Sequence, residues 1–297
     1  MSSAARSSSP RLEPGTLWDK VALTTRGALD AGTLEPLPVS LETATDRGIR
    51  FAVRVLTPSD RKRHHTARQK EKGENPFLPY EPTMFVSDVS PTHLCLLNKF
   101  PAVPGHTLIV TRAFEEQTAP LARADFEAAW LCLQEGEALV FYNSGGPAGA
   151  SQPHRHLQIV PAPLAPGFLR SPIDAAVSDA RFQEGMGRIE AFGFHHALAR
   201  LRIAGAASHK RAAEVMHGLY LAMARAFGCD KPERPYNLLL TRDWMLFVPR
   251  VRAHWERIGV NGLGFAGCLL VRGPEQLAAL RAHGPLNVLR DVSVSFD

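Results

Sequence analysis

Residues 143–161 read NSGGPAGASQPHRHLQIVP, and this stretch decides both the fold and the chemistry that the chain can support. Its second half has the pattern of a β-strand that follows a turn-rich loop. In an extended strand, successive side chains point to opposite faces. His154, His156 and Gln158 therefore share one face, and the residues between them take the other. Two imidazoles and an amide converge on one small volume.

The segment before this strand is built from small residues. Its three glycines, Gly145, Gly146 and Gly149, are followed by Ala150 and Ser151. Because bulky side chains are missing, a ligand can approach the backbone N–H groups of such a loop closely. A row of imidazoles beside a cradle of N–H donors suits a phosphate ester.

Length and composition indicate an ordinary globular protein. The 297-residue chain can bury a proper core, as one large or two modest domains. No apolar stretch reaches the ~20 residues that a membrane-spanning helix needs, and residues 1–15 lack the apolar core of a secretory signal. We therefore expect a cytoplasmic protein that does not contact a membrane, as a monomer or a small homo-oligomer.

Cysteines and charge narrow the class of partner. The four cysteines stand far apart with no C-x-x-C pair, which argues against a disulfide framework and against a thiolate zinc site. The net charge of +5 favours an anionic ligand. The one dense basic run, residues 61–72, has no interleaved aromatic residues on which bases could stack, so we do not expect nucleic acid binding. Small phosphorylated metabolites fit better.

Helical and strand patterns alternate in groups along the chain. Helical spacing of apolar residues is found over 17–31, 126–139, 209–227 and 275–284. The β-type or continuous apolar runs lie in 51–56, 93–99, 106–112, 140–143, 154–160, 195–203, 236–242, 244–250 and 263–273. Short turns join many of these runs, which indicates an α+β fold built on antiparallel sheet. The proline-rich segment 161–171 is the best candidate boundary between two halves.

Two simple interpretations of the histidine pair compete with catalysis. A His-x-His pair on a strand commonly supplies two ligands to zinc or iron. Gln158 is a poor third ligand, however, and no acidic residue occurs in 143–161. The other alternative makes both histidines ordinary polar residues on a solvated strand face, with glycines that serve only a turn.

The third interpretation is nucleophilic catalysis at phosphorus. A neutral imidazole attacks an α-phosphate, expels the rest of a polyphosphate and holds the nucleotidyl group until an acceptor arrives. An imidazole needs no base near neutral pH, because its unperturbed pKa is ~6.5. It needs orientation, with one ring nitrogen donating to a backbone carbonyl and the other presenting its lone pair. Positioned donors must then stabilise the charge on the phosphoryl oxygens.

The sequence also resembles a known family. The pattern N-x-G-x-x-x-G-A-S-Q-x-H-x-H-x-Q, from Asn143 to Gln158, is similar to the signature of the diadenosine tetraphosphate phosphorylases, or ATP adenylyltransferases, a transferase branch of the histidine-triad superfamily. Four further blocks are similar in the same order: NPFLPYEP, LLNKFPAVPGHTLIVTRAFEEQ, YNLLLTRDWMLFVPR and GFAGCLLV. Together they cover most of residues 50–290.

The resemblance implies a fold and a division of the chain. The fold is α+β, a histidine-triad-like antiparallel sheet flanked by helices with a C-terminal α+β extension. A flexible tail is expected over 1–16, a histidine-triad-like catalytic part over 17–163 and an ATP adenylyltransferase part over 164–297. The implied reaction is reversible: diadenosine tetraphosphate and phosphate give ATP and ADP through an adenylylated histidine.

The resemblance also assigns roles to residues. His156 is the nucleophile, Gln158 binds the α-phosphoryl group where the hydrolase branch has a third histidine, and His154 orients the site. The implied substrate and phosphate contacts are Asn143, Gly149, Ala150, Ser151, Gln152, Asn98, Lys99, Lys62 and Arg272. Arg272 departs from the family, which has a lysine there, and a guanidinium binds phosphate with different geometry.

The expected partners are a dinucleoside polyphosphate, ATP, ADP and inorganic phosphate. We expect no metal held by the protein and no covalently bound cofactor, with Mg²⁺ as an ion that accompanies the nucleotide. Two other functions stay open: a hexose-1-phosphate uridylyltransferase-like enzyme, which shares the His-x-His-x-Gln arrangement, and a nucleotide-binding protein without turnover.

Overall fold

A single antiparallel sheet carries both strands that bracket the glycine-rich loop. The structure is a computed structural model that describes residues 12–56, 75–183, 185–203, 208–231 and 233–296. Its ten-stranded sheet has the pairing order β3 (Phe85–Asp88), β4 (His93–Leu97), β5 (Thr107–Thr111), β7 (His156–Pro161), β6 (Ala138–Asn143), β11 (Tyr236–Leu240), β12 (Trp244–Pro249), β10 (Ala197–Arg200), β9 (Met186–Arg188) and β8 (Arg181–Gln183). This confirms the expected α+β class with a large antiparallel sheet.

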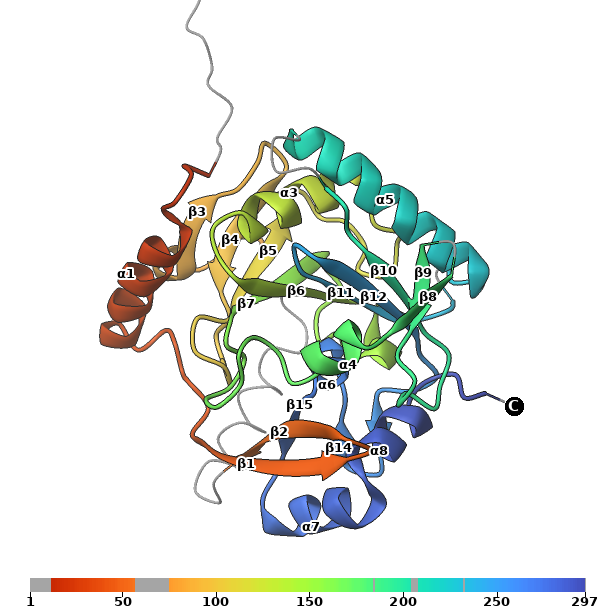
Figure 1. Ribbon diagram of the computed structural model, residues 1–297. Helices are drawn as coiled ribbons and strands as arrows, with labels where there is room; N and C mark the ends of the chain where they lie inside the picture. Colours follow the sequence, from red (N-terminus) through yellow and green to blue (C-terminus); the bar gives the residue numbers. More distant parts are fainter. Residues whose placement is uncertain (1–11, 57–74, 184, 204–207, 232, 297) are drawn as a thin grey trace, which may run out of the picture.

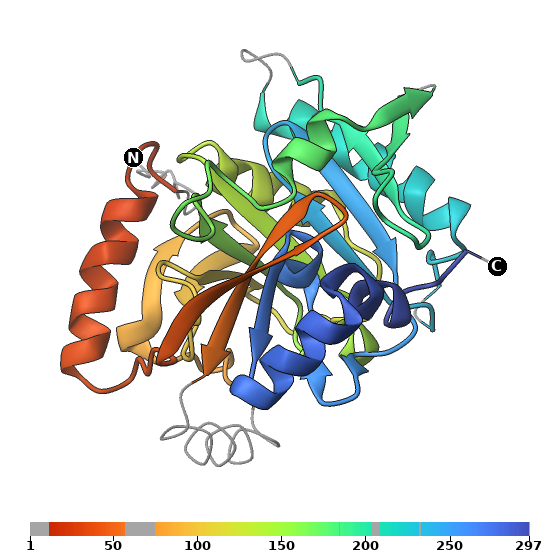
Figure 2. The ribbon, with the colours of Figure 1, turned by 60° about the horizontal axis from the view of Figure 1, so that its bottom comes forward.

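Different layers cover the two faces of this sheet (Figure 1). The helices on one side are α1 (Leu17–Asp30), α3 (Arg123–Leu133) and α5 (His209–Ala226). On the other side lies a three-stranded sheet of β1 (Val39–Asp46), β2 (Ile49–Leu56) and β15 (Cys268–Val271), in which β15 runs parallel to β2. Three helices accompany this small sheet: α6 (Gly262–Phe265), α7 (Pro274–His283) and α8 (Pro285–Asp291). Figure 2 shows the small sheet and these helices together from below.

The remaining elements are short. They are the 3-10 turns η2 (Pro82–Met84) and η3 (Gly146–Ala148), the helix α4 (Asp174–Ser178), and the paired strands β13 (His254–Trp255) and β14 (Ile258–Gly259). No helix in the described ranges is both long and apolar enough to cross a membrane.

The alternation expected for the histidine strand is realised in β7. Leu157 and Ile159 join the core beneath the helices, whereas Val160 belongs to the core on the opposite face. His156 and Gln158 therefore face the side of the small sheet, because side chains two apart in a strand share a face. Strand β7 pairs with β5 and with β6, so the strand that bears the histidines lies inside the sheet.

The helix ends differ from the expected ones for local reasons. The helix predicted over 126–139 spans Arg123–Leu133, because Asp125 caps it from its first turn by accepting from the backbone N–H of Ala122 at 2.6 Å. Gly136, at φ 155°, lies in the turn that follows. Strand β1 and helix α8 were not expected, since VSLETATD lacks a regular apolar alternation and only Gly284 separates α8 from α7.

The predicted boundary at 161–171 lies in the loop between β7 and α4. Strand β6, which precedes it, pairs with β11, which follows it, with Tyr142 opposite Leu238. The sheet is thus continuous across the boundary, and the division into 17–163 and 164–297 stays a prediction. The tail expected over 1–16 is described from residue 12, and Leu12 is buried.

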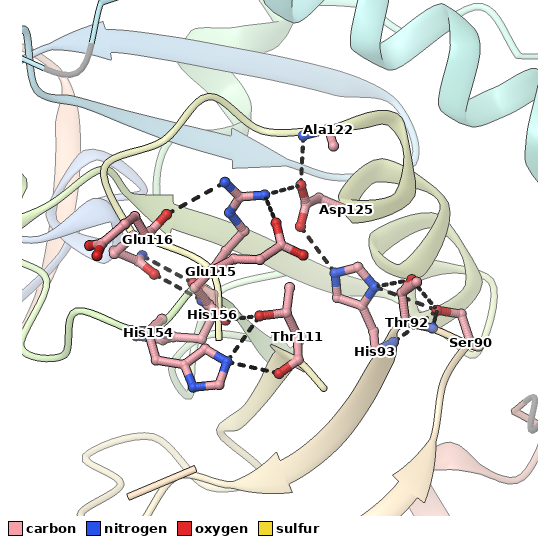
Figure 3. A network of polar contacts seen from close by, with 12 residues as sticks. Ser90, Thr92, His93, Thr111, Glu115, Glu116, Ala122, Asp125, His154 and His156 are labelled. Carbon is pink, nitrogen blue, oxygen red and sulfur yellow. Dashed lines mark hydrogen bonds and ion pairs between the residues drawn. The ribbon is translucent and has the colours of Figure 1, made fainter. Parts of the chain in front are cut away.

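A buried ion-pair network holds β7 from the helix side. Arg155 Nη1 lies 3.3 Å from Asp125 Oδ2 and also pairs with Glu115. Asp125 Oδ1 lies 3.0 Å from Nε2 of His93, and both side chains are 1% exposed. Figure 3 shows Asp125 between Ala122 and His93.

Removal of the Asp125 carboxylate should destabilise the whole protein. We expect Asp125→Ala to lower the free energy of unfolding by about 3–5 kcal/mol, because the buried guanidinium of Arg155 would lose its buried partner. Denaturant unfolding measures the change. The matched control is Asp243→Ala, whose carboxylate is 60% exposed and 2.7 Å from Arg170, and which should cost at most about 1 kcal/mol. Equal losses in the two variants would contradict this account.

Candidate active site

Four neighbouring strands of the large sheet place polar side chains on the same face. His106 immediately precedes β5, His156 and Gln158 lie in β7, Asn143 ends β6, and Asn237 lies in β11. Each of the five is at least nine-tenths buried. Buried polar groups cost stability unless they are hydrogen-bonded, so the partners of this polar row show what it is arranged to do.

His156 has one ring nitrogen bound and the other open. Its Nδ1 lies 2.8 Å from the carbonyl oxygen of His154. A carbonyl only accepts, so Nδ1 carries the proton and the lone pair of the neutral ring is on Nε2. Burial lowers the pKa of His156 to about 4, which keeps the ring neutral near pH 7. Among the described residues, Nε2 has no hydrogen-bond partner.

His196 has the same Nδ1 contact as His156, but its Nε2 is occupied. His196 Nδ1 lies 2.8 Å from the carbonyl oxygen of Phe194, which is again two residues earlier, and burial again lowers the pKa to about 4. Its Nε2, however, accepts the backbone N–H of Ile189 at 2.8 Å. Only His156 of the two keeps a free lone pair.

Both ring nitrogens of His154 are hydrogen-bonded within the protein. Its Nε2 lies 2.8 Å from the carbonyl oxygen of Thr111 and 3.0 Å from the hydroxyl of the same residue. Its Nδ1 lies 3.0 Å from the amide nitrogen of Asn75. Figure 3 shows the ring directed towards Thr111. Both ring nitrogens of His154 thus bind other residues, and its carbonyl oxygen accepts from Nδ1 of His156.

Gln158 contacts a histidine that was not among the predicted site residues. Its Oε1 lies 2.9 Å from Nε2 of His106. The amide nitrogen of Asn98 lies 3.1 Å from the other ring nitrogen of His106. Burial is the main cause that lowers the pKa of His106 to about 4. Two predicted residues, Asn98 and Gln158, are therefore linked through His106.

The backbone of His156 is held by the side chain of Gln117, which is 1% exposed. Gln117 Oε1 accepts the N–H of His156 at 2.8 Å. Its Nε2 donates to the carbonyl oxygens of Asn143 at 2.8 Å and of His156 at 3.2 Å. The Gln117 amide thus bridges the backbones of β6 and β7 in place of a direct backbone hydrogen bond. It does so where the two strands separate into the glycine-rich loop.

Asn143 is anchored by its oxygen and has an unused donor. Its Oδ1 accepts the N–H of Gly262 at 2.9 Å and the amide of Asn237 at 2.8 Å. Its Nδ2 is buried and has no partner among the described residues. An unsatisfied buried donor is costly. A phosphate oxygen is the type of acceptor that would satisfy it.

Arg250 ties the glycine-rich loop to the second half of the chain. Its guanidinium binds Oδ1 of Asn237 and donates to the carbonyl oxygens of Ala148 at 3.3 Å, Val260 at 3.0 Å and Val292 at 3.0 Å. Burial lowers its pKa to about 9, so the group is still charged at neutral pH. One cation thus supports both the loop and the anchor of Asn143.

The glycine-rich loop is held in one shape. Gly149 has φ +94°, and a Cβ there would lie 2.9 Å from Val260 and Asn261, so only glycine fits. The N–H groups of Gly149 and Ala150 donate back into the loop, to Gly146 and Gly145. The N–H groups of the loop without an acceptor among the described residues are those of Gly146, Ser151 and Gln152.

Two of the three predicted cations, Lys99 and Arg272, are exposed. Lys99 is exposed, and its Nζ lies 5.3 Å from the ring centroid of Phe100. Arg272 is exposed directly after β15, where its backbone N–H donates to Gln276. Lys62 lies outside the described residues. The structure therefore brings together the predicted histidines and amides, whereas Arg272 has no contact with them among the described residues.

The donor set does not suit a metal. Both ring nitrogens of His154 are hydrogen-bonded, which leaves His156 as the single open imidazole of the pair. Within the described ranges, no group of three or more His, Cys, Asp or Glu side chains could hold an ion. The arrangement instead offers a lone pair beside N–H donors, which is what nucleophilic attack on a phosphoryl group requires.

Sequence reasoning did not identify Gln117, His106, Asn237 or Arg250 as parts of this site. All four lie in blocks that resemble the family, Gln117 and His106 in LLNKFPAVPGHTLIVTRAFEEQ and the other two in YNLLLTRDWMLFVPR, and this was the one available signal. Each is a single polar residue in an ordinary strand or loop. Their roles depend on strand pairing, which local sequence does not encode.

Protein-family models match both halves of the chain. The model of the Ap4A phosphorylase N-terminal domain matches residues 7–179, where Ap4A is diadenosine tetraphosphate. The model of the ATP adenylyltransferase C-terminal domain matches residues 190–295.

Relatives from Saccharomyces cerevisiae extend this likeness. Protein APA1 is 32% identical over 244 residues, which is 70% of this chain and 71% of the relative. Diadenosine 5',5'''-P1,P4-tetraphosphate phosphorylase 2 is 29% identical over 275 residues, 80% of each protein. The crystal structure of yeast Ap4A phosphorylase Apa2 superimposes with a TM-score of 0.79 and 23% identity, over 96% of this chain and 99% of that one. Its complex with Ap4A gives a TM-score of 0.78 and 24% identity over the same shares of the two chains. These superpositions show the same fold.

Acid should weaken the fold through its buried histidines. Burial lowers the pKa values of His106, His156 and His196 to about 4, whereas an unfolded histidine titrates near ~6.5. Between these values the unfolded chain binds more protons than the folded protein. The stability that the three neutral histidines contribute is therefore complete above pH ~6.5, and it is lost as the pH falls towards about 4. Denaturant unfolding at several pH values between 7 and 4.5 measures the slope.

The contribution of one histidine can be separated. His196→Gln removes one of the three groups, so its unfolding free energy should depend less steeply on pH in the same window. A slope identical to that of the parent protein would contradict the assignment of His196.

Proposed function

The chain belongs to the Ap4A phosphorylase and ATP adenylyltransferase family, and from this membership and the geometry of His156 we propose that it converts diadenosine tetraphosphate and inorganic phosphate reversibly into ATP and ADP through an adenylyl-histidine. The observation that carries the proposal is the free lone pair on Nε2 of His156, opposite an Nδ1–H bound to the carbonyl of His154.

In the first half-reaction, Nε2 of His156 attacks the α-phosphorus of the substrate. A nitrogen–phosphorus bond forms, the bond from that phosphorus to the bridging oxygen breaks, and ATP leaves with the electron pair of that oxygen. The imidazole becomes positively charged and keeps its Nδ1–H on the carbonyl of His154, which is 2.8 Å away. The carbonyl dipole stabilises this charge without any proton transfer.

In the second half-reaction, an oxygen of inorganic phosphate attacks the same phosphorus on the enzyme. The nitrogen–phosphorus bond breaks, ADP leaves, and the lone pair returns to Nε2. The same steps in reverse make diadenosine tetraphosphate from ATP and ADP, so the enzyme is a reversible nucleotidyltransferase.

Donors around His156 support these steps. The Nδ2 of Asn143, which has no partner in the described part of the chain, is suited to an oxygen of the polyphosphate. Within the described residues, the N–H groups of Ser151 and Gln152 are open for the same purpose. We assign the remaining contacts to Gly149, Ala150, Asn98, Lys99, Lys62 and Arg272, as the family pattern implies.

The proposal includes no covalently bound cofactor and no metal held by the protein. A Mg²⁺ ion that accompanies the nucleotide would neutralise part of the polyphosphate charge. The proposed partners are dinucleoside polyphosphate, ATP, ADP and inorganic phosphate.

Covalent labelling tests the proposal directly. Protein mixed with diadenosine tetraphosphate labelled at the α-phosphorus, without inorganic phosphate, should release ATP and retain an acid-labile label. His156→Ala should abolish the label while the protein stays folded, because the attacking nitrogen is gone. Quenching with detergent at alkaline pH followed by electrophoresis detects the label, acid treatment should then remove it, and circular dichroism verifies the fold.

The matched control is His196→Gln, which alters a buried histidine with the same Nδ1 contact but an occupied Nε2. This variant should retain the label. Product analysis separates the alternatives: ATP and ADP formed only with phosphate support the phosphorylase, whereas ATP and AMP without phosphate mean a hydrolase. Turnover of UDP-glucose in place of diadenosine tetraphosphate would mean a uridylyltransferase, and binding without products would mean a non-catalytic protein.

A further inference from the structure

The orientation of the Gln158 amide follows from a chain of hydrogen bonds that starts at a backbone N–H. The N–H of Phe100 can only donate, and it lies 3.2 Å from Oδ1 of Asn98. The oxygen of Asn98 is therefore the acceptor, and its NH₂ group must face the next partner in the chain, the ring of His106.

The imidazole of His106 continues this polarity. The Asn98 nitrogen lies 3.1 Å from Nδ1 and 3.3 Å from Nε2 of His106. Because Asn98 donates, the nearer Nδ1 accepts, and a neutral ring then carries its proton on Nε2. This Nε2 lies 2.9 Å from Gln158, so the Gln158 atom that faces it must be an acceptor, which is Oε1.

We propose that His106 is a positioning residue that holds the oxygen of the Gln158 amide, so that its NH₂ group faces the phosphoryl group bound beside His156. The inference rests on the proposed function, because it names what the amide donates to. Among the described residues, the NH₂ group of Gln158 has no hydrogen-bond partner. Without His106, the amide could rotate and present its oxygen, which repels phosphoryl oxygens.

The packing around His106 supports a fixed ring. Its side chain is 7% exposed, and its ring centroid lies 5.7 Å from that of Phe141. His106 precedes β5 on the side where Leu108 pairs with Gln158, so the two polar side chains are diagonal neighbours on one face of the sheet. The hydrogen bonds from Asn98 through His106 to Gln158 therefore orient the Gln158 NH₂ group before the substrate binds.

A double-mutant cycle tests whether His106 acts through Gln158. The measured quantity is the single-turnover rate of ATP release from diadenosine tetraphosphate. We expect His106→Leu, which fills the space without a donor, to lower this rate about tenfold, the equivalent of roughly one hydrogen bond. In the Gln158→Met background, the same change should alter the rate less than about twofold, because the amide is already absent.

Conservative replacement supplies a second readout. His106→Gln places an amide N–H near the position of Nε2, and it should restore most of the rate lost in His106→Leu. A loss of equal size in both Gln158 backgrounds would overturn the proposal, as would a His106→Gln variant no better than His106→Leu.

A measurement on the unaltered protein needs a variant only to assign the signal. In ¹⁵N-histidine NMR at pH 7, His106, assigned by its loss in His106→Gln, should show a protonated Nε2 and an unprotonated Nδ1. The opposite tautomer would overturn the proposal. If the parent protein released no ATP from diadenosine tetraphosphate, the proposed function would fail instead, and the tautomer would still report on the relay.

Discussion

The hydrogen bond from Nδ1 of His156 to the carbonyl oxygen of His154 is the interaction on which the rest of the structure depends. It assigns the proton to one side of the ring and the lone pair to the other. That assignment is useful only if the strand itself stays in place. Arg155 holds the strand from behind through the buried carboxylate of Asp125, and Gln117 holds it from the side through the backbone of His156. The chemistry of one nitrogen atom is thus prepared by contacts behind and beside a single strand.

Much of this arrangement could be predicted because it is local. The alternation of side chains in residues 154–160 follows from the geometry of a strand, and the structure confirms it in the two cores that Leu157 and Val160 enter. The long helix expected over 209–227 is present as His209–Ala226, because its apolar spacing is regular and Ser208 caps it. Family resemblance added the order of the blocks, and with it the reaction.

The parts that sequence reasoning missed are the long-range ones. Gln117 and His106 reach the histidine strand from segments far along the chain, and no local pattern marks either residue as special. Asn143 could be named from the motif, but the contacts that hold it come from Gly262 and Asn237 in the other half of the chain. Boundaries also moved where a side chain caps from an unexpected position, as Asp125 does in α3. Strand pairing and capping decide such details, and both depend on the folded whole.

The parallel pair of β2 and β15 has a consequence for how the protein is made. Ala52 pairs with Cys268, so a strand near the start of the chain can complete its pairing only with a strand near the end. Pairings this distant in sequence form slowly, because the intervening chain must be ordered first. During synthesis on the ribosome, the hairpin of β1 and β2 emerges early with one edge of β2 open. An open strand edge can pair with the strands of other chains and so promote aggregation. The layer that covers the catalytic face is therefore also the layer completed last, and the nascent protein acquires its site only when almost the whole chain has been made.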